Sequence, residues 1–427
     1  MLSILKLKDY RNLWLAQIVS ELGDGITSLL IIYLASTLSD DPLVYSFVLM
    51  VRYLPSVLFG TLAGPIVDRF SKKYIMIAAD LYRSLIVLAI ILCQTSLPLI
   101  IFLTFLLGLG TVFFEPARSA TIPRIIHKES IPEAVGLSQS TMMAMSIIAP
   151  SLGGILLLTK HYTSMLLFDS LTFFLSALIL LTVHIPNDAT NQVNEENKQS
   201  YLNSLKEGLR ILTTNTLLLG LFWLLIAGLL FVSMLNTNIY PLLLDEFKVG
   251  ELHFGTLQTV VGAAGLLGSF FVTFFMRKVK ARNLIIYTFL FIGLMCLLVS
   301  PVASLHESFP LIPIYAWFVC IGFTNTFINV PVNSLLLQTL PEKMVGRITG
   351  VMVSVINVST LAGLYFGGLL AGKIGSVGAI IMAGGGFLIF AIIFPQTKYY
   401  KALRLSNPDS EKRDIQGQEM QIQEATK

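Results

Sequence analysis

The stretch GPIVDRFSKKYIMIAADLYR, residues 64 to 83, places four cations and two aspartates between two long apolar runs. Apolar residues make up 55% of the 427-residue chain and charged residues 13%, with a mean hydropathy of +0.77. Soluble globular proteins have about 25% charged residues, so this chain has too few charges to cover an aqueous surface. The apolar runs suit helices of roughly 20 residues that cross a bilayer, and they are too long for the strands of a membrane barrel. The sequence therefore predicts an all-α membrane protein in which the charges at 68–73 lie between two spans.

Twelve spans are predicted, and a polar segment divides them six and six. We expect an N-terminal six-helix bundle in 1–184, a cytoplasmic linker in 185–215, a C-terminal six-helix bundle in 216–395 and a disordered cytoplasmic tail in 396–427. The predicted spans run approximately 12–36, 43–67, 74–95, 97–119, 136–159, 164–184, 216–243, 252–276, 284–303, 309–334, 347–371 and 375–395.

Lysine and arginine are distributed unequally between the two sides of these spans. The side with both termini and the linker has 24 of them, and the other side has 3. Because short loops rich in Lys and Arg stay in the cytoplasm, we expect a plasma-membrane protein with both termini inside. This distribution accounts for the net charge of +4 without nucleic acid as a partner. The three cysteines lie in apolar runs, where their spacing suits neither a disulfide framework nor a metal site.

The two halves also share short sequence features. PARS (116–119) ends the fourth predicted span, and PVNS (331–334) ends the tenth. Gly153 and Gly154 in span five correspond to Gly367 and Gly368 in span eleven. Internal repeats of six spans are typical of transporters, whose substrate site lies between the repeats.

The opening stretch also contains a longer pattern, GxxxDRxSKK, formed by Gly64, Asp68, Arg69, Lys72 and Lys73. This pattern resembles the signature found between the second and third spans of the major facilitator superfamily. The resemblance implies the major facilitator fold and a gating role for this segment.

Within that segment we expect the acidic and basic residues to have different roles. Asp68 is predicted to contact the start of span eleven, near Gly346 and Arg347, and to hold the carrier open to the outside. Lys72 and Lys73 are expected mainly to set orientation. The alternative is that all of these charges serve topology alone.

Span five contains a second pattern, IAPSLGG (148–154). It resembles the fifth-span antiporter signature of the same superfamily, with Ala149 in place of the first glycine and with Pro150, Gly153 and Gly154 in their expected places. The resemblance implies export rather than uptake, and the alternative is an ordinary packing face of small residues. The segments LGD (22–24), AADLYR (78–83) and FEPARSATIP (114–123) are similar to the macrolide-efflux and enterobactin-exporter branch. Thr104 stands where that superfamily has an arginine associated with proton coupling, so coupling must use other residues or be absent.

Seven ionisable residues lie inside predicted spans, all in the first half. An Asp or Arg facing lipid at mid-span costs roughly 2.5–3.5 kcal/mol on insertion scales, so these side chains should face protein or water. We interpret Asp80, Arg83 and Glu115 as structural charges, with Arg83 as a candidate substitute for the missing arginine. The seven are Glu21, Asp24, Arg52, Asp80, Arg83, Glu115 and Asp169.

Gln17, Glu21 and Asp24 share one face of span one, which we expect to line a cavity. Asp24 and Arg52 lie at similar depths in their spans, so they are candidates for a pair. Buried carboxylates can bind protons near neutral pH. Asp24 is therefore the first candidate for the proton carrier and Glu21 the second. The alternative is a static pair that only joins two helices.

The second half contributes amides and aromatic rings instead of charges. Asn236, Asn325, Asn329 and Trp317 are predicted to contact substrate, because such groups bind amphipathic molecules without requiring a charge. A hydrogen-bonded seam between helices would produce the same pattern.

These features together predict a monomeric exporter that uses the proton gradient, without a cofactor, to expel amphipathic small molecules such as drugs or macrolides by alternating access. The sequence contains no recognisable catalytic motif, so we do not expect an enzyme. An exporter of one endogenous metabolite or siderophore would share every feature. An uptake permease and a non-transport receptor are the remaining alternatives.

Overall fold

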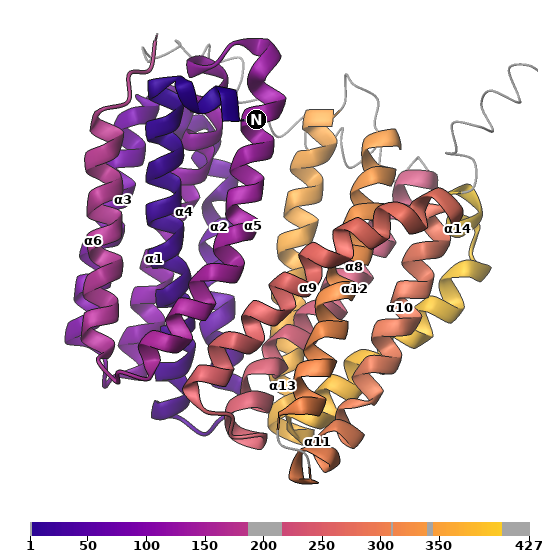
Figure 1. Ribbon diagram of the computed structural model, residues 1–427. Coiled ribbons are helices and arrows are strands. Elements are labelled where there is room, and N and C mark those ends of the chain that lie inside the picture. The colour runs from indigo at the N-terminus through magenta and orange to yellow at the C-terminus, as the bar shows by residue number, and fades with distance from the viewer. Residues whose placement is uncertain (1, 187–215, 309–310, 340–344, 404–427) are drawn as a thin grey trace, which may run out of the picture.

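The computed structural model describes residues 2–186, 216–308, 311–339 and 345–403, which are almost entirely helical and contain no strand. Figure 1 shows two groups of helices side by side, one from each half of the chain. Many large apolar side chains, such as Leu85, Leu92 and Phe270, point outward and are exposed, as expected for helices that face lipid. The prediction of an all-α membrane protein is confirmed.

Six long helices form the first group. Their starts follow from local sequence: the Ser71 hydroxyl accepts a hydrogen bond from the Tyr74 N–H at 3.4 Å at the start of α3, and prolines occupy the first turns of α4 and α5. The helices are α1 (Lys8–Leu38), α2 (Leu43–Arg69), α3 (Lys72–Leu92), α4 (Leu97–Ile125), α5 (Ile131–Leu157) and α6 (Tyr162–Leu181), with short 3-10 helices η1 (Leu2–Lys6) and η2 (Lys128–Ser130).

The second group contains the 49-residue element α13, in which two helices are joined at a kink. It includes both spans predicted at 347–371 and 375–395, and Gly375, with a φ of 76°, interrupts its helical geometry. The elements are α8 (Thr216–Pro241), the π-helical η3 (Leu242–Glu246), α9 (Glu251–Lys278), α10 (Ala281–Leu297), α11 (Val299–Ser308), α12 (Ile312–Thr339), α13 (Val345–Ile393), η5 (Phe394–Gln396) and α14 (Lys398–Ala402).

Ten helices among the described residues are long and apolar enough to cross a bilayer. The apolar helix α10 is shorter, and α13 counts once although two spans are predicted in it. The count of twelve spans therefore remains a prediction.

Two predicted segments differ in how far the structure describes them. The linker predicted at 185–215 lies outside the described residues except for its first two. The start of the tail, by contrast, is ordered: α14 packs on α8, and the Tyr400 hydroxyl donates to Asn283 Oδ1 at 2.6 Å. The tail was predicted to be disordered from residue 396. This prediction is wrong for α14, because its aromatic residues pack on other helices.

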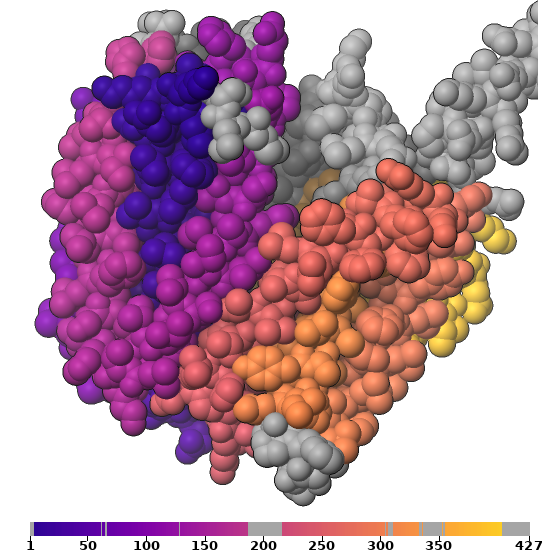
Figure 2. Space-filling model, in the orientation of Figure 1, coloured from indigo at the N-terminus to yellow at the C-terminus, as the bar shows by residue number. Residues whose placement is uncertain are grey.

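The two halves meet at the end of the molecule where α1 ends and α9 begins, which we call the closed end. Here α5 packs on α9 and α2 packs on α13. A Cβ atom on Gly154 would lie 2.6 Å from the Cα of Gly255, so these two helices touch through their backbones. Gly368 of α13 makes the equivalent close approach to Ser46 of α2. Figure 2 shows the two halves pressed together in the lower part of the view.

Three side-chain hydrogen bonds also join the halves at the closed end. The Tyr33 hydroxyl donates to Glu251 Oε1 at 3.1 Å, and the Tyr45 hydroxyl donates to Asp245 Oδ1 at 3.1 Å. The hydroxyls of Ser46 and Thr237 lie 2.9 Å apart. The closed end therefore combines small-residue packing with hydrogen bonds from hydroxyl groups.

Candidate functional site

A cavity of about 740 Å³ lies beyond the closed end, toward the end where α1 begins. Its walls come from α1, α2 and α4 of the first half and from α13 of the second, so both halves contribute. Most lining side chains are apolar or small, and three are charged. The lining residues are Asp24, Ile31, Arg52, Tyr53, Ser56, Val57, Gly60, Thr104, Leu107, Gly108, Thr111, Val112, Glu115, Pro116, Asn357 and Val358.

Asp24 and Arg52 form an ion pair across α1 and α2 in the cavity wall. Arg52 Nη2 lies 2.6 Å from Asp24 Oδ2, and Arg52 also donates to the Ser28 hydroxyl. The side chains of Arg52 and Asp24 are 36% and 29% exposed, so both reach the cavity. The similar depths predicted for Asp24 and Arg52 in their spans thus correspond to a contact between the two side chains. A proton-carrying role for Asp24 stays a prediction.

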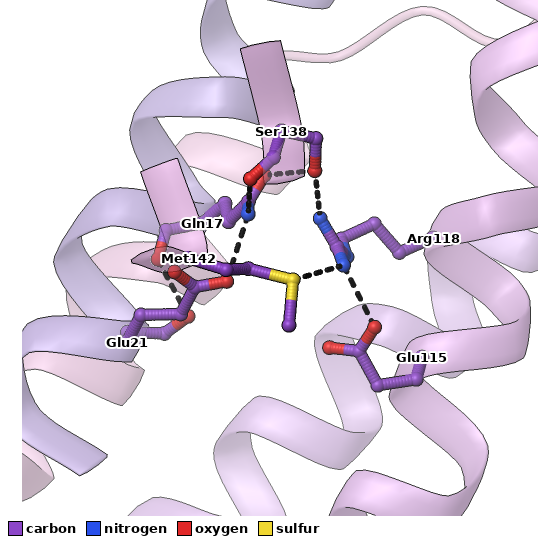
Figure 3. A network of polar contacts seen from close by, with 7 residues as sticks. Gln17, Glu21, Glu115, Arg118, Ser138 and Met142 are labelled. Atoms are coloured by element: carbon purple, nitrogen blue, oxygen red, sulfur yellow. Dashed lines mark hydrogen bonds and ion pairs between the residues drawn. The ribbon is translucent and has the colours of Figure 1, made fainter. Parts of the chain in front are cut away.

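A second polar network joins α1, α4 and α5 beside the cavity (Figure 3). Gln17 Nε2 donates to Glu21 Oε1 at 2.8 Å, and the Ser138 hydroxyl donates to Gln17 Oε1 at 2.8 Å. Arg118 donates from Nη1 to the Ser138 hydroxyl at 2.6 Å and from Nη2 to Glu115 Oε2 at 2.7 Å. The network runs without a break from Glu115, which lines the cavity, to Glu21.

Gln17 was expected to line the cavity and Glu115 to be a structural charge, and the structure places both residues differently. Gln17 is buried in the network and is not a lining residue, because its amide is used by Glu21 and Ser138. Glu115 pairs with Arg118, as a structural charge would, but its side chain is 43% exposed and forms part of the cavity wall.

Asp80 and Arg83 form a buried pair inside the first half. Arg83 donates to Asp80 Oδ1, and Ser176 of α6 donates to Asp80 Oδ2 at 2.6 Å. The guanidinium lies between the rings of Phe114 and Phe173, at 4.5 and 4.3 Å from their centroids. This pair joins α3, α4 and α6 and does not line the cavity, and the Arg83 side chain packs against Gly110 of α4, while its predicted structural role stays a prediction.

The segment around residues 64–73 is more helical than a loop signature suggests. Gly64, Asp68 and Arg69 belong to α2, and the last two are exposed. Lys72 is buried and donates to the carbonyls of Asp68 and Phe70, while Lys73 donates to the carbonyls of 181 and 183. These lysines thus also hold α2, α3 and α6 together. The predicted partner of Asp68 at 346–347 has no described side chains, so that contact lies outside the described residues.

The fifth-span signature faces two different neighbours. Ala149 and Gly153 pack on α1, at Gly25 and Leu29 respectively. Gly154 and the Pro150 carbonyl approach Gly255 of α9. The motif therefore lies where the wall of the first half meets the second half.

The predicted contacts in the second half separate into two places. Asn236, Asn325 and Asn329 line a smaller pocket of about 70 Å³ between α8, α10 and α12, and Asn329 Nδ2 donates to Asn325 Oδ1 at 2.7 Å. Trp317 lines neither cavity: it is buried, and its indole N–H donates to the Met295 carbonyl at 2.8 Å. Its role in the described structure is packing between α12 and α10.

The sequence offers Arg118 as a partner for Glu115, but it does not identify the hydrogen bonds of the closed end or the contact of Arg118 with Ser138. Tyr45 and Asp245 are 200 positions apart, and no local pattern links such partners. Arg118 was visible within FEPARSATIP, but its contact with Ser138 depends on how α4 packs on α5. Within the described residues, no group of three His, Cys, Asp or Glu side chains is placed to hold a metal ion.

Comparisons with known proteins agree with this architecture. The profile described as Major Facilitator Superfamily matches residues 13–364. The chain is 26% identical over 412 residues to Macrolide efflux protein A of Streptococcus pyogenes, covering 94% of this chain and 98% of that protein. It is 25% identical to Macrolide efflux protein A of Enterococcus faecalis, covering 74% and 97%. The solved structure of the nucleoside transporter NupG aligns with a TM-score of 0.70 at 14% identity, covering 91% of this chain and 99% of that one.

Proposed function

The chain belongs to the major facilitator superfamily and is a multi-span membrane transporter rather than an enzyme, and from this we propose that it is a proton-coupled exporter of amphipathic small molecules such as drugs or macrolides. The observation that carries the proposal is the cavity of about 740 Å³, which both halves line and which combines an apolar wall with three charged side chains. Its volume is in the usual range of ligand sites, roughly 300–1,000 Å³. The names of the macrolide-efflux relatives support the same substrate class.

The cavity also fits one state of an alternating-access cycle. The end where α1 begins is rich in Lys and Arg, so we assign it to the cytoplasm of a plasma-membrane protein. The halves are in contact at the opposite end, and the cavity is then accessible from the inside. Substrate would enter from the cytoplasm and leave after the halves rock apart at the closed end.

The family signatures have roles in this cycle. The fifth-span motif, through Gly154, forms part of the contact that must open toward the outside. Asp68, exposed at the end of α2, would close the inner side by meeting the start of α13 in the opposite state. The carboxylates of α1, Asp24 and Glu21, are the candidates for coupling the cycle to protons.

The test is efflux from cells that express the chain. Accumulation of a panel of macrolides and amphipathic dyes is measured with and without a protonophore, against cells that have the empty vector. We expect lower accumulation of some compounds and loss of this difference with the protonophore. Higher accumulation would indicate an uptake permease, and export of one endogenous metabolite with no effect on the panel would indicate a dedicated exporter.

A further inference from the structure

The two polar groups near the cavity differ in their balance of charge. Asp24 and Arg52 contribute one carboxylate and one guanidinium, joined at 2.6 Å, and Arg52 also reaches Ser28. Such a pair is neutral when both groups are ionised. It therefore has no electrostatic need to bind a proton.

The network in Figure 3 is not balanced in this way. It contains two carboxylates, Glu21 and Glu115, and one guanidinium, Arg118, which is 6% exposed. With all three ionised, the network has a net charge of −1 in the membrane part of the protein. One bound proton makes it neutral, so binding a proton removes the cost of an uncompensated charge.

The contacts show which carboxylate has the excess charge. Arg118 is bound to Glu115, whose side chain also meets the cavity. Glu21 receives only the neutral amide of Gln17 on Oε1, and its Oε2 is buried with no hydrogen-bond partner. A buried anionic oxygen without a donor is costly, whereas the protonated acid is neutral.

We propose that Glu21 binds the transported proton and that Arg118 and Glu115 connect this site with the cavity, so that the proton is bound here and not on Asp24. This rests on the proposed function, since it specifies the coupling site of the exporter. Releasing the proton to cavity water leaves Glu21 ionised and changes the network from neutral to −1.

Arg118 is the positioning residue that makes this exchange possible. Its Nε is buried without a partner, and its contact with Met142 Sδ is long, at 3.9 Å. Ser138 lies between Arg118 and Gln17, so two hydrogen bonds link the guanidinium to the amide that holds Glu21. The guanidinium therefore has donors available when Glu21 becomes charged.

The other charged groups around Glu21 do not take this role. The charged groups that act on it are Arg118 and Glu115 of α4 and Asp24 of α1, while α5 contributes the neutral Ser138 and Met142. Arg52 of α2 is held by Asp24. Asp169 of α6, packed on α1, is fully buried and its Oδ2 also has no hydrogen-bond partner, but it bonds to Thr172 of its own helix, whereas Glu21 is linked through Gln17, Ser138 and Arg118 to Glu115 in the cavity wall.

The experiment uses the purified full chain in lipid nanodiscs and needs no substrate. Infrared difference spectra between alkaline and acidic pH report the C=O band of carboxylic acids that gain a proton. We expect Glu21→Gln to lose a titrating band that Asp24→Asn retains. Asp169→Asn, which removes the other buried carboxylate that has an oxygen without a partner, should also retain this band, and its loss there with retention in Glu21→Gln would overturn the assignment. Arg118→Gln should increase the titrating band, because two carboxylates then lack their cation.

Loss of the band in Asp24→Asn together with its retention in Glu21→Gln would overturn the assignment. An unchanged band in Arg118→Gln would also overturn the assignment. This second variant keeps the measurement decisive if Glu21→Gln folds poorly. The spectra are independent of transport. If the titrating band belongs to Glu21 but the cells show no efflux, the proposed function is rejected and the site is retained. If efflux is proton-driven but Glu21 gives no titrating band, the site is rejected and the proposed function is retained.

Discussion

The closed end and the cavity of this protein are held together by different kinds of contact. At the closed end, the two halves meet through small residues, such as Gly154 and Gly255, and through hydroxyl hydrogen bonds, such as Tyr45 to Asp245. Beside and behind the cavity, ion pairs lie inside the first half, one between α1 and α2 and the other two each within a single helix. These are Asp24–Arg52, Glu115–Arg118 and Asp80–Arg83.

The difference has a direct consequence for motion. Separating a buried ion pair costs several kcal/mol, because each charge is left without compensation. Separating small residues or a hydroxyl from its acceptor costs about 1 kcal/mol per contact. The contacts between halves are therefore the ones that a rocking motion can break and remake, while the ion pairs described above stay inside one moving body.

The largest effect is expected from breaking an ion pair that does not cross between halves. Asp80→Asn leaves the buried Arg83 without its carboxylate and should destabilise the protein by about 3–5 kcal/mol. Thermal unfolding of the purified protein in detergent measures this. Ser176→Ala, which removes only one donor to Asp80, is the matched control with a smaller loss. An Asp80→Asn protein as stable as the parent would mean that the pair does not hold the bundle.

A smaller effect, on conformation rather than on folding, is expected at the closed end. Gly154→Leu places a side chain where Gly255 lies 2.6 Å from the first added atom, so it should disfavour the closed end by about 1–3 kcal/mol. The test uses a protein without the native cysteines, with spin labels at Asp40→Cys and Lys248→Cys, which lie on opposite halves. The distance between the two labels should be longer in Gly154→Leu than in the parent. Gly385→Ala, where an added Cβ meets nothing within 4 Å, is the control. Unchanged label distances would contradict the assignment of Gly154 to the gate.

The smallest effects are expected from single hydrogen bonds between halves. Tyr33→Phe and Tyr45→Phe each remove one hydroxyl donor, which stabilises the closed end by about 0.5–1.5 kcal/mol. Each variant should raise the fraction of separated labels roughly two- to tenfold. The double variant should add the two effects, since the bonds are on different helices. A decrease in separation would show that these bonds do not favour the closed state.

Much of the fold was predictable because a bilayer imposes strong composition rules. The long apolar runs predicted helices, and the paired glycines at 153–154 and 367–368 marked one helix in each of the two contacts, α5 with α9 and α2 with α13, that join the halves at the closed end. What composition could not predict is how helices continue past the membrane. The second span was predicted to end at residue 67, but α2 continues to Arg69 and includes Asp68 of the signature.

The candidate site was predictable residue by residue but not as a set of partners. The polar face of span one predicted that Gln17, Glu21 and Asp24 would lie together, yet their partners come from three other helices. Asp24 pairs with α2, whereas Glu21 is linked through α5 to α4. Periodicity gives the face of one helix, and only packing decides which neighbour that face meets.

Gly375 gives α13 a mechanical property that a loop would not. The part of α13 before it touches α2 at Gly368, and the part after it packs closely on α10 at Gly293 and Gly384. One glycine with a φ of 76° joins the two parts, a backbone conformation that glycine adopts without the steric cost of a Cβ atom. The two parts therefore meet at a single bend, with the α2 contact on one side of it and the α10 contact on the other.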